Sequence, residues 1–94
     1  MYQNLPYLTD RVAIPAEALR DLILSVPGVL DCHDITSRGI PGEMVFIEMH
    51  LVVEPQDIES AHRLTEEVEH LLQGRYGPAR ILIHLEPRSH IEQP

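Results

Sequence analysis

The sequence has little of what nucleic-acid-binding and membrane-spanning proteins use. It has no tryptophan, one phenylalanine and three tyrosines, and its 7 basic residues, all arginine, face 15 acidic ones. The formal net charge of −8 argues against partners such as nucleic acid or an anionic membrane surface. The scarcity of aromatic rings also argues against an RNA-binding sheet, which stacks bases on such side chains.

Long hydrophobic runs and paired cysteines are absent as well. Apolar stretches such as Met44–Ile47 are far shorter than the ~20 residues that cross a bilayer. The N-terminus has neither a basic region nor an apolar core of a secretory signal, so we expect a cytoplasmic location without direct membrane insertion. A single cysteine, Cys32, excludes an intramolecular disulfide and a Cys-x-x-Cys motif.

The chain of 94 residues is long enough for one domain, and its apolar residues follow helical periodicity in some segments and strand periodicity in others. We expect a lead-in over 1–13, a domain over 14–88 and a tail over 89–94. Within the domain the pattern predicts, in order, a helix over 15–26, strands over 29–37 and 45–53, a helix over 57–72 and a strand over 79–86.

This αββαβ order predicts a two-layer α+β sandwich with both helices on one face of a three-stranded sheet. The last two strands, joined by a helical crossover, should be parallel and adjacent. Two sets of residues are expected to face the core: Ile58, Ala61, Thr65, Val68 and Leu72 from the second helix, and Ile81, Ile83 and Leu85 from the last strand.

Histidines and carboxylates are plentiful for a chain of this size, with six histidines. If the apolar faces of both strands point toward the helices, His50, His84 and Glu86 emerge together on the uncovered face. Imidazole and carboxylate groups are ligands of zinc and related divalent ions. The candidate metal ligands are His33, His50, His84 and Glu86, with His62 and Asp34 in reserve.

Simpler interpretations stay open for each of these residues. A lone histidine on a strand can be merely exposed, and Cys32 can be a small buried hydrophobe or a soft metal ligand. We interpret His70 as a solvated helix residue and His90 as part of the tail. A histidine–carboxylate pair could also act in acid–base catalysis, but no nucleophile, phosphate loop or oxyanion motif supports an enzyme.

Five segments carry a family resemblance. They are Val26-Pro27-Gly28-Val29, His33-Asp34-Ile35 with Arg38, Phe46-Ile47-Glu48-Met49-His50-Leu51, Ala61-His62 followed by Val68-Glu69, and Ile83-His84-Leu85-Glu86-Pro87. In this order, over about residues 15–87, they resemble the cytoplasmic C-terminal domain of cation diffusion facilitator transporters.

The resemblance implies a metallochaperone-like (ferredoxin-like) αββαβ fold that pairs as a V-shaped homodimer. It also implies binding of a divalent transition metal, mainly zinc, with Cd²⁺, Fe²⁺, Mn²⁺, Co²⁺, Ni²⁺ and Cu²⁺ as alternatives. Ligands of zinc-transporting members fall on His33, His50, His62, His84 and Glu86, and Asp34 matches a position used between protomers in some members.

The transporters place six membrane helices before this domain, so we expect a free-standing or excised copy of it. Such a domain would sense metal and regulate efflux, carry metal, or pair with a membrane cation efflux transporter. The alternative is a purely structural dimerisation module without a physiological metal site.

Overall fold

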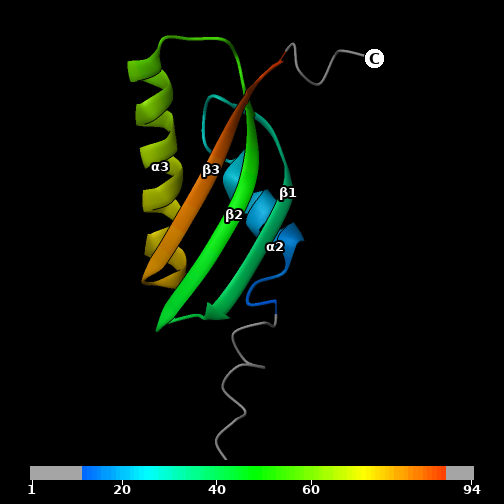
Figure 1. Ribbon diagram of the computed structural model, residues 1–94, viewed down its shortest axis with the longest axis vertical. Coiled ribbons are helices and arrows are strands. Elements are labelled where there is room, and N and C mark those ends of the chain that lie inside the picture. Colours follow the sequence, from blue (N-terminus) through cyan, green and yellow to red (C-terminus); the bar gives the residue numbers. More distant parts are fainter. Residues whose placement is uncertain (1–11, 89–94) are drawn as a thin grey trace, which may run out of the picture.

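The computed structural model describes residues 12–88, which form two helices and one three-stranded sheet. The elements follow the order α2 (Ala16–Leu24), β1 (Val29–Ile40), β2 (Met44–Val53), α3 (Ile58–Tyr76) and β3 (Ala79–Pro87) (Figure 1). The predicted lead-in and tail lie almost wholly outside the described residues.

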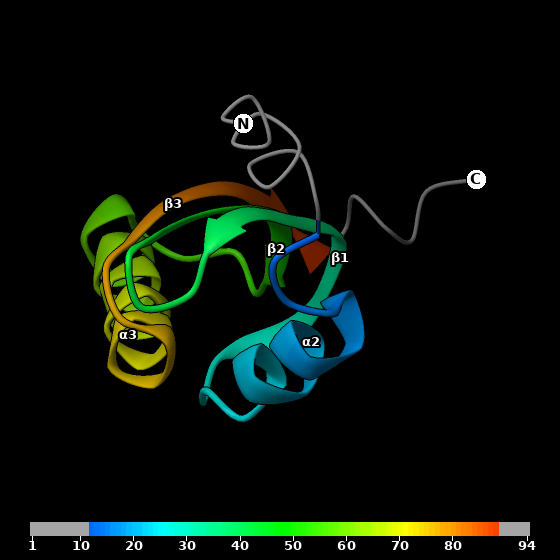
Figure 2. The same ribbon diagram turned by 90° about the horizontal axis from the view of Figure 1, so that it is seen from below.

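The sheet has the order β1-β2-β3, with β1 and β2 antiparallel and β2 and β3 parallel. Both helices cover the same face of the sheet and leave the other face uncovered, as Figure 2 shows. The two-layer α+β prediction, including the parallel and adjacent β2 and β3, is therefore confirmed. We call the uncovered side the open face.

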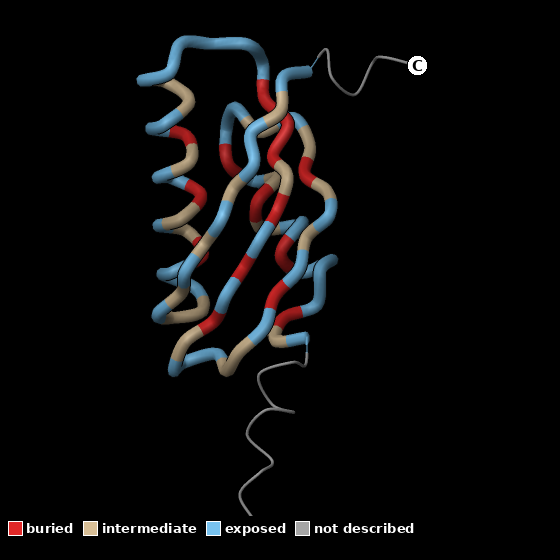
Figure 3. Tube along the Cα trace, viewed as in Figure 1, coloured by how far each residue is buried: buried red, intermediate tan, exposed pale blue. Residues whose placement is uncertain are grey.

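The core lies between the sheet and the helices. Figure 3 shows that buried positions recur along β2 and along the helices. Val45, Ile47, Met49, Leu51 and Val53 of β2 are all buried. They pack with Leu19 and Ile23 of α2 and with Leu64, Val68 and Leu72 of α3.

The expected inward face of α3 was partly wrong. Ile58 is 87% exposed, whereas Leu64, which was not predicted to face inward, is 6% exposed. The buried stripe, Leu64, Val68 and Leu72, has i,i+4 spacing. Ile58 is the first residue of α3 and lies ahead of this stripe along the helix axis, whereas Ala61 and Thr65 are half-buried.

The edge strand β3 is covered less completely than its pattern predicted. Ile81 and Ile83 are half-buried against the core, but Leu85 is 40% exposed. Only β2, at the centre of the sheet, is flanked by a strand on both sides. Alternation correctly predicts which residues share a face, but it does not predict how fully an edge strand is covered.

Helix α3 also extends past its predicted end. The helix was predicted over 57–72, with Gly74 and Gly77-Pro78 as the signals that end it. It continues past Gly74 to Tyr76 and is capped by Gly77, whose φ is 87°. The Gly77 N–H donates to the carbonyl of Gln73, and the positive φ is a conformation that glycine adopts without strain.

An irregularity in β1 decides which of its side chains reach the open face. The register with β2 shifts between His33 and Thr36, and Asp34 in this interval has a φ of 53°. Directly paired residues share a face, so His33 lies beside His50, and Arg38 beside Phe46. The extra residue reverses the alternation along β1, as expected for a β-bulge.

The first described residues are tied to the end of β1. Ser37 is 3% exposed. Its hydroxyl accepts a hydrogen bond from the N–H of Ile14 and donates one to the carbonyl of Ile14, both at 2.9 Å. Val12 forms an isolated antiparallel bridge with Arg38.

Candidate metal centre

Three histidines form a row across the open face, one from each strand of the sheet. His33 of β1 pairs with His50 of β2, and His50 pairs with His84 of β3. The ring centroids are 5.1 Å apart for His33 and His50 and 4.7 Å apart for His50 and His84. The sheet register therefore brings together residues that are 17 and 34 positions apart in the chain.

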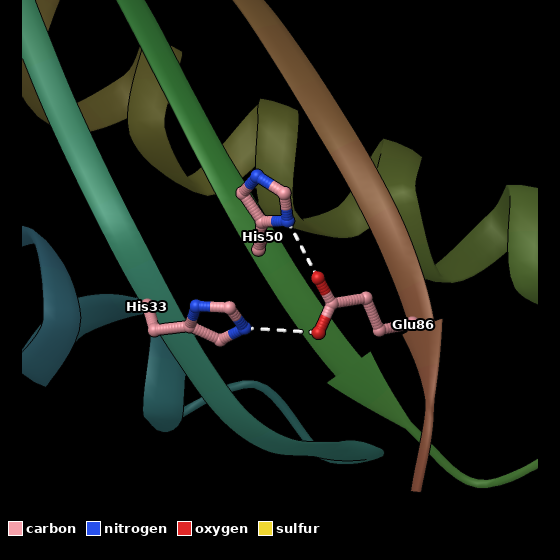
Figure 4. Close-up of side chains that lie close together, drawn as sticks. All are labelled: His33, His50 and Glu86. Atoms are coloured by element: carbon pink, nitrogen blue, oxygen red, sulfur yellow. Dashed lines mark hydrogen bonds and ion pairs between the residues drawn. The ribbon is translucent and has the colours of Figure 1, made fainter. Parts of the chain in front are cut away.

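Glu86 joins two of these imidazoles (Figure 4). One carboxylate oxygen lies 2.9 Å from His33 Nε2, and the other lies 2.5 Å from His50 Nδ1. The Glu86 side chain is only 13% exposed. One ligand atom from each residue lies within 4.8 Å of the other two, and no other such group of three occurs among residues 12–88.

The electrostatics of this group favour protonation of His33. The hydrogen bond to Glu86 raises the pKa of His33 above its ordinary value, burial opposes this, and a contact with Asp34 adds to it. In turn, the hydrogen bonds from His33 and His50 lower the pKa of Glu86. The carboxylate is therefore kept ionised beside a readily protonated imidazole.

His84 lies next to this group but has another partner. Its Nε2 is 2.9 Å from a carboxylate oxygen of Glu48, which precedes His50 by two positions on the same face of β2. Glu48 was not among the candidate ligands predicted from the sequence. Its period-two spacing from a candidate ligand was the available signal.

The two reserve ligands lie at different places. The Asp34 carboxylate is 3.1 Å from His33 Nδ1 and its side chain is 71% exposed, at the edge of the group. His62 lies on α3, which covers the opposite face of the sheet, and pairs with Glu66 at 3.3 Å. Within this chain the structure does not bring His62 to the other histidines.

Cys32, unlike His90, lies among the described residues. Cys32 belongs to the buried core on the helix side, where burial raises the pKa of its thiol. It therefore fits the small-hydrophobe interpretation. His90 lies outside the described residues.

The donor set suits a divalent transition metal. Two imidazole nitrogens and one carboxylate oxygen match the chemistry of zinc ligands, and they come from the three different strands of the sheet. Zinc takes four ligands in structural sites, so a further donor, such as water or another side chain, would complete the set.

Comparisons with known proteins agree with this chemistry. Residues 14–88 match the family described as "Cation efflux protein, cytoplasmic domain". The chain is 38% identical over 92 residues to the cation-efflux pump FieF of Yersinia pestis (strain Pestoides F), and the match covers 94% of this chain. It spans only 30% of the length of that relative.

Solved structures show the same fold. The Zn form of CzrB has a TM-score of 0.71 at 30% identity, covering 84% of this chain and 94% of that one. A MamM CTD in a nickel form has a TM-score of 0.66 at 23% identity, covering 78% of this chain and 94% of that one, and supports the fold alone.

The family match bears on two expectations. It confirms the predicted resemblance, and its description confirms the cytoplasmic location. Among the described residues, no helix is long and apolar enough to cross a bilayer. A match over residues 14–88, together with the likeness to the CzrB structure, shows that the chain belongs to the family of cytoplasmic domains of cation efflux proteins.

Proposed function

We propose that the chain binds a divalent transition metal, zinc in the first place, on the open face of its sheet through His33, His50 and Glu86. The observation that carries the proposal is the convergence of one ligand atom from each residue within 4.8 Å. The Zn form of the related CzrB structure supports zinc over the alternatives Cd²⁺, Fe²⁺, Mn²⁺, Co²⁺, Ni²⁺ and Cu²⁺.

His84 is the next ligand in the proposed site. Its ring stacks 4.7 Å from that of His50, so a rotation of the side chain away from Glu48 would bring an imidazole nitrogen to the group. Asp34 already contacts His33 and would act at the edge of the site. His62 would act only from a second protomer, because α3 covers the other face of its own sheet.

A homodimer gives this site a regulatory role. Where the open face meets a second protomer, its carboxylates and protonated imidazoles repel like groups of that protomer or leave a gap between the two protomers. A bound dication replaces this repulsion with coordination shared by both protomers. Metal would then favour the closed dimer by its difference in affinity for the two states. The proposed role is metal sensing that regulates a membrane cation efflux transporter, or metal carriage, and no catalysis is involved.

A calorimetric titration with zinc tests the site. Wild type should bind zinc, and His50→Ala should lose most of that affinity because the central imidazole of the row is removed. His70→Ala is the matched control, since it removes an exposed imidazole from α3. Equal zinc affinity in wild type and His50→Ala would refute the site.

The dimer is tested separately by light scattering after size-exclusion chromatography, with and without zinc. A monomer in both conditions would refute the pairing. A dimer that binds no zinc would instead support the alternative function, a structural dimerisation module.

A further inference from the structure

A second cluster lies on the open face, at the opposite end of the sheet from the histidines. Here Arg38 of β1, Phe46 of β2 and Arg80 of β3 are direct neighbours in the register. All three are on the same face, because paired residues of adjacent strands share a face. Both arginines are exposed, and Phe46 is 46% exposed. We call this the Arg–Phe–Arg row.

The row borders a shallow hollow of about 230 Å³. In the adjacent row of the sheet, Thr36, Glu48 and Leu82 also line it, and Leu82 is 55% exposed. The hollow thus has apolar surface from Phe46 and Leu82 between two guanidinium groups. An exposed apolar surface framed by charge is typical of a binding site.

The charges of this row are unusual in a chain with a net charge of −8. Most other arginines of residues 12–88 have carboxylate partners: Arg20 with Asp31, Arg63 with Glu59 and Arg88 with Glu54. Within the same described range, the side chain of neither Arg38 nor Arg80 forms a hydrogen bond or ion pair. Two guanidinium groups, each with donors arranged for a carboxylate or phosphate, are therefore available.

The spacing allows both arginines to contact one anion. They flank β2 on either side, so their backbones are separated by two strand spacings, about 10 Å. Arginine side chains are long enough to converge over the Phe46 ring from these positions. The carboxylate that also lines the hollow, Glu48, is paired with His84 at 2.9 Å on the side toward the histidine row.

We infer that this hollow binds a small organic anion, with its carboxylate or phosphate held by Arg38 and Arg80 and its apolar part packed on Phe46 and Leu82. The site is separate from the proposed metal centre and uses none of its three ligands. It would give the domain a second ligand class, so that an anionic metabolite as well as a metal could influence it.

Phenyl phosphate is a suitable probe, with inorganic phosphate and benzyl alcohol as its charged and apolar halves. Chelator-treated, metal-free protein would be titrated by ¹H–¹⁵N correlation spectroscopy, because phosphate could otherwise bind to a metal ion. Phenyl phosphate should give saturable shifts of the Thr36 and Leu82 amides, and each half should bind more weakly than the whole probe.

Variants identify the residues responsible. Arg38→Gln and Arg80→Gln should each weaken phenyl phosphate binding about tenfold or more, because each removes a charge-assisted contact. Arg63→Gln, the same change on α3, should have no effect. Phe46→Ala should weaken phenyl phosphate but not inorganic phosphate, and its spectrum shows directly whether the variant is folded.

Three results would overturn the inference. They are the absence of saturable shifts, equal affinity in wild type and both arginine variants, and inorganic phosphate binding as tightly as phenyl phosphate. A membrane surface is tested by flotation with phosphatidylglycerol vesicles. Flotation that depends on Arg38 and Arg80, without saturable binding of the small probe, would replace the small anion with a lipid surface.

Discussion

The hydrogen bonds of Glu86 lead to a quantitative prediction about how pH and metal compete. Zinc binds neutral imidazole, so a protonated His33 must lose its proton before it can ligate. Glu86 raises the pKa of His33 above its ordinary value of 6.5. Competition between proton and metal should therefore begin above pH 6.5 and grow as the pH falls.

The magnitude follows from the number of protons displaced. Below the raised pKa of His33, at least one proton is released per zinc ion bound, so affinity should fall about tenfold or more for each pH unit. Calorimetry at about pH 6, in two buffers with different ionisation enthalpies, counts these protons directly. Zinc binding at this pH without proton release would refute the reasoning.

Glu86→Gln separates the two roles of the carboxylate. The variant removes the carboxylate that stabilises the protonated form of His33, so the pKa of His33 should fall relative to wild type. An NMR pH titration that follows the imidazole ring nitrogens would measure this change. Zinc affinity should also fall, by about 100-fold or more, since even indirect supporting groups of metal ligands contribute 10- to 100-fold. Glu67→Gln makes the same change at an exposed position of α3 as a control.

The interaction of His33 with Glu86 should also make the free energy of unfolding of the metal-free protein depend on pH. A raised His33 pKa stabilises the fold below pH 6.5, and this contribution is lost as the pH rises through the raised value. A lowered Glu86 pKa stabilises it above 4.5, and this is lost as the pH falls through the lowered value. The stability difference between wild type and Glu86→Gln should thus be largest between these limits.

Three further predictions concern the fold. Leu19→Ala should lower the free energy of unfolding by about 2–5 kcal/mol in urea titrations, because Leu19 is fully buried, while Ile58→Ala, at an exposed position, should have little effect. Gly39→Ala should destabilise the chain by more than ~1 kcal/mol, since φ is 105° and a Cβ would lie 2.3 Å from a backbone oxygen, and wild-type stability would contradict this. Asp57→Ala should lower the melting temperature by several degrees, because Asp57 accepts the N-terminal hydrogen bond of α3 at 2.7 Å. The hydrogen bonds from Ser60 lower the pKa of Asp57, so this stabilisation should disappear as the pH falls through the lowered value, and a pH-independent difference would contradict the assignment.

The sequence predicted the open face of β2 and β3 well, for a physical reason. Both strands alternate regularly, so His50 and His84 share the open face once both apolar faces point to the helices, and the observed register then pairs them directly. Glu86 is two residues beyond His84 and so lies on the same face. What alternation could not predict is the choice of partner, because the hydrogen bonds of Glu86 to His33 and His50 depend on side-chain rotamers.

The bulge in β1 explains why the Arg–Phe–Arg row was not predicted. Strict alternation from His33 would place Arg38 on the helix side, where an unpaired charge would be costly. The extra residue at Asp34, with its positive φ, reverses the alternation, so both His33 and Arg38 reach the open face. Asp is one of the few residues other than glycine that adopts this conformation readily. One backbone irregularity therefore supplies both the β1 ligand of the proposed metal centre and one arginine of the proposed anion site, and a change at Asp34 should affect both.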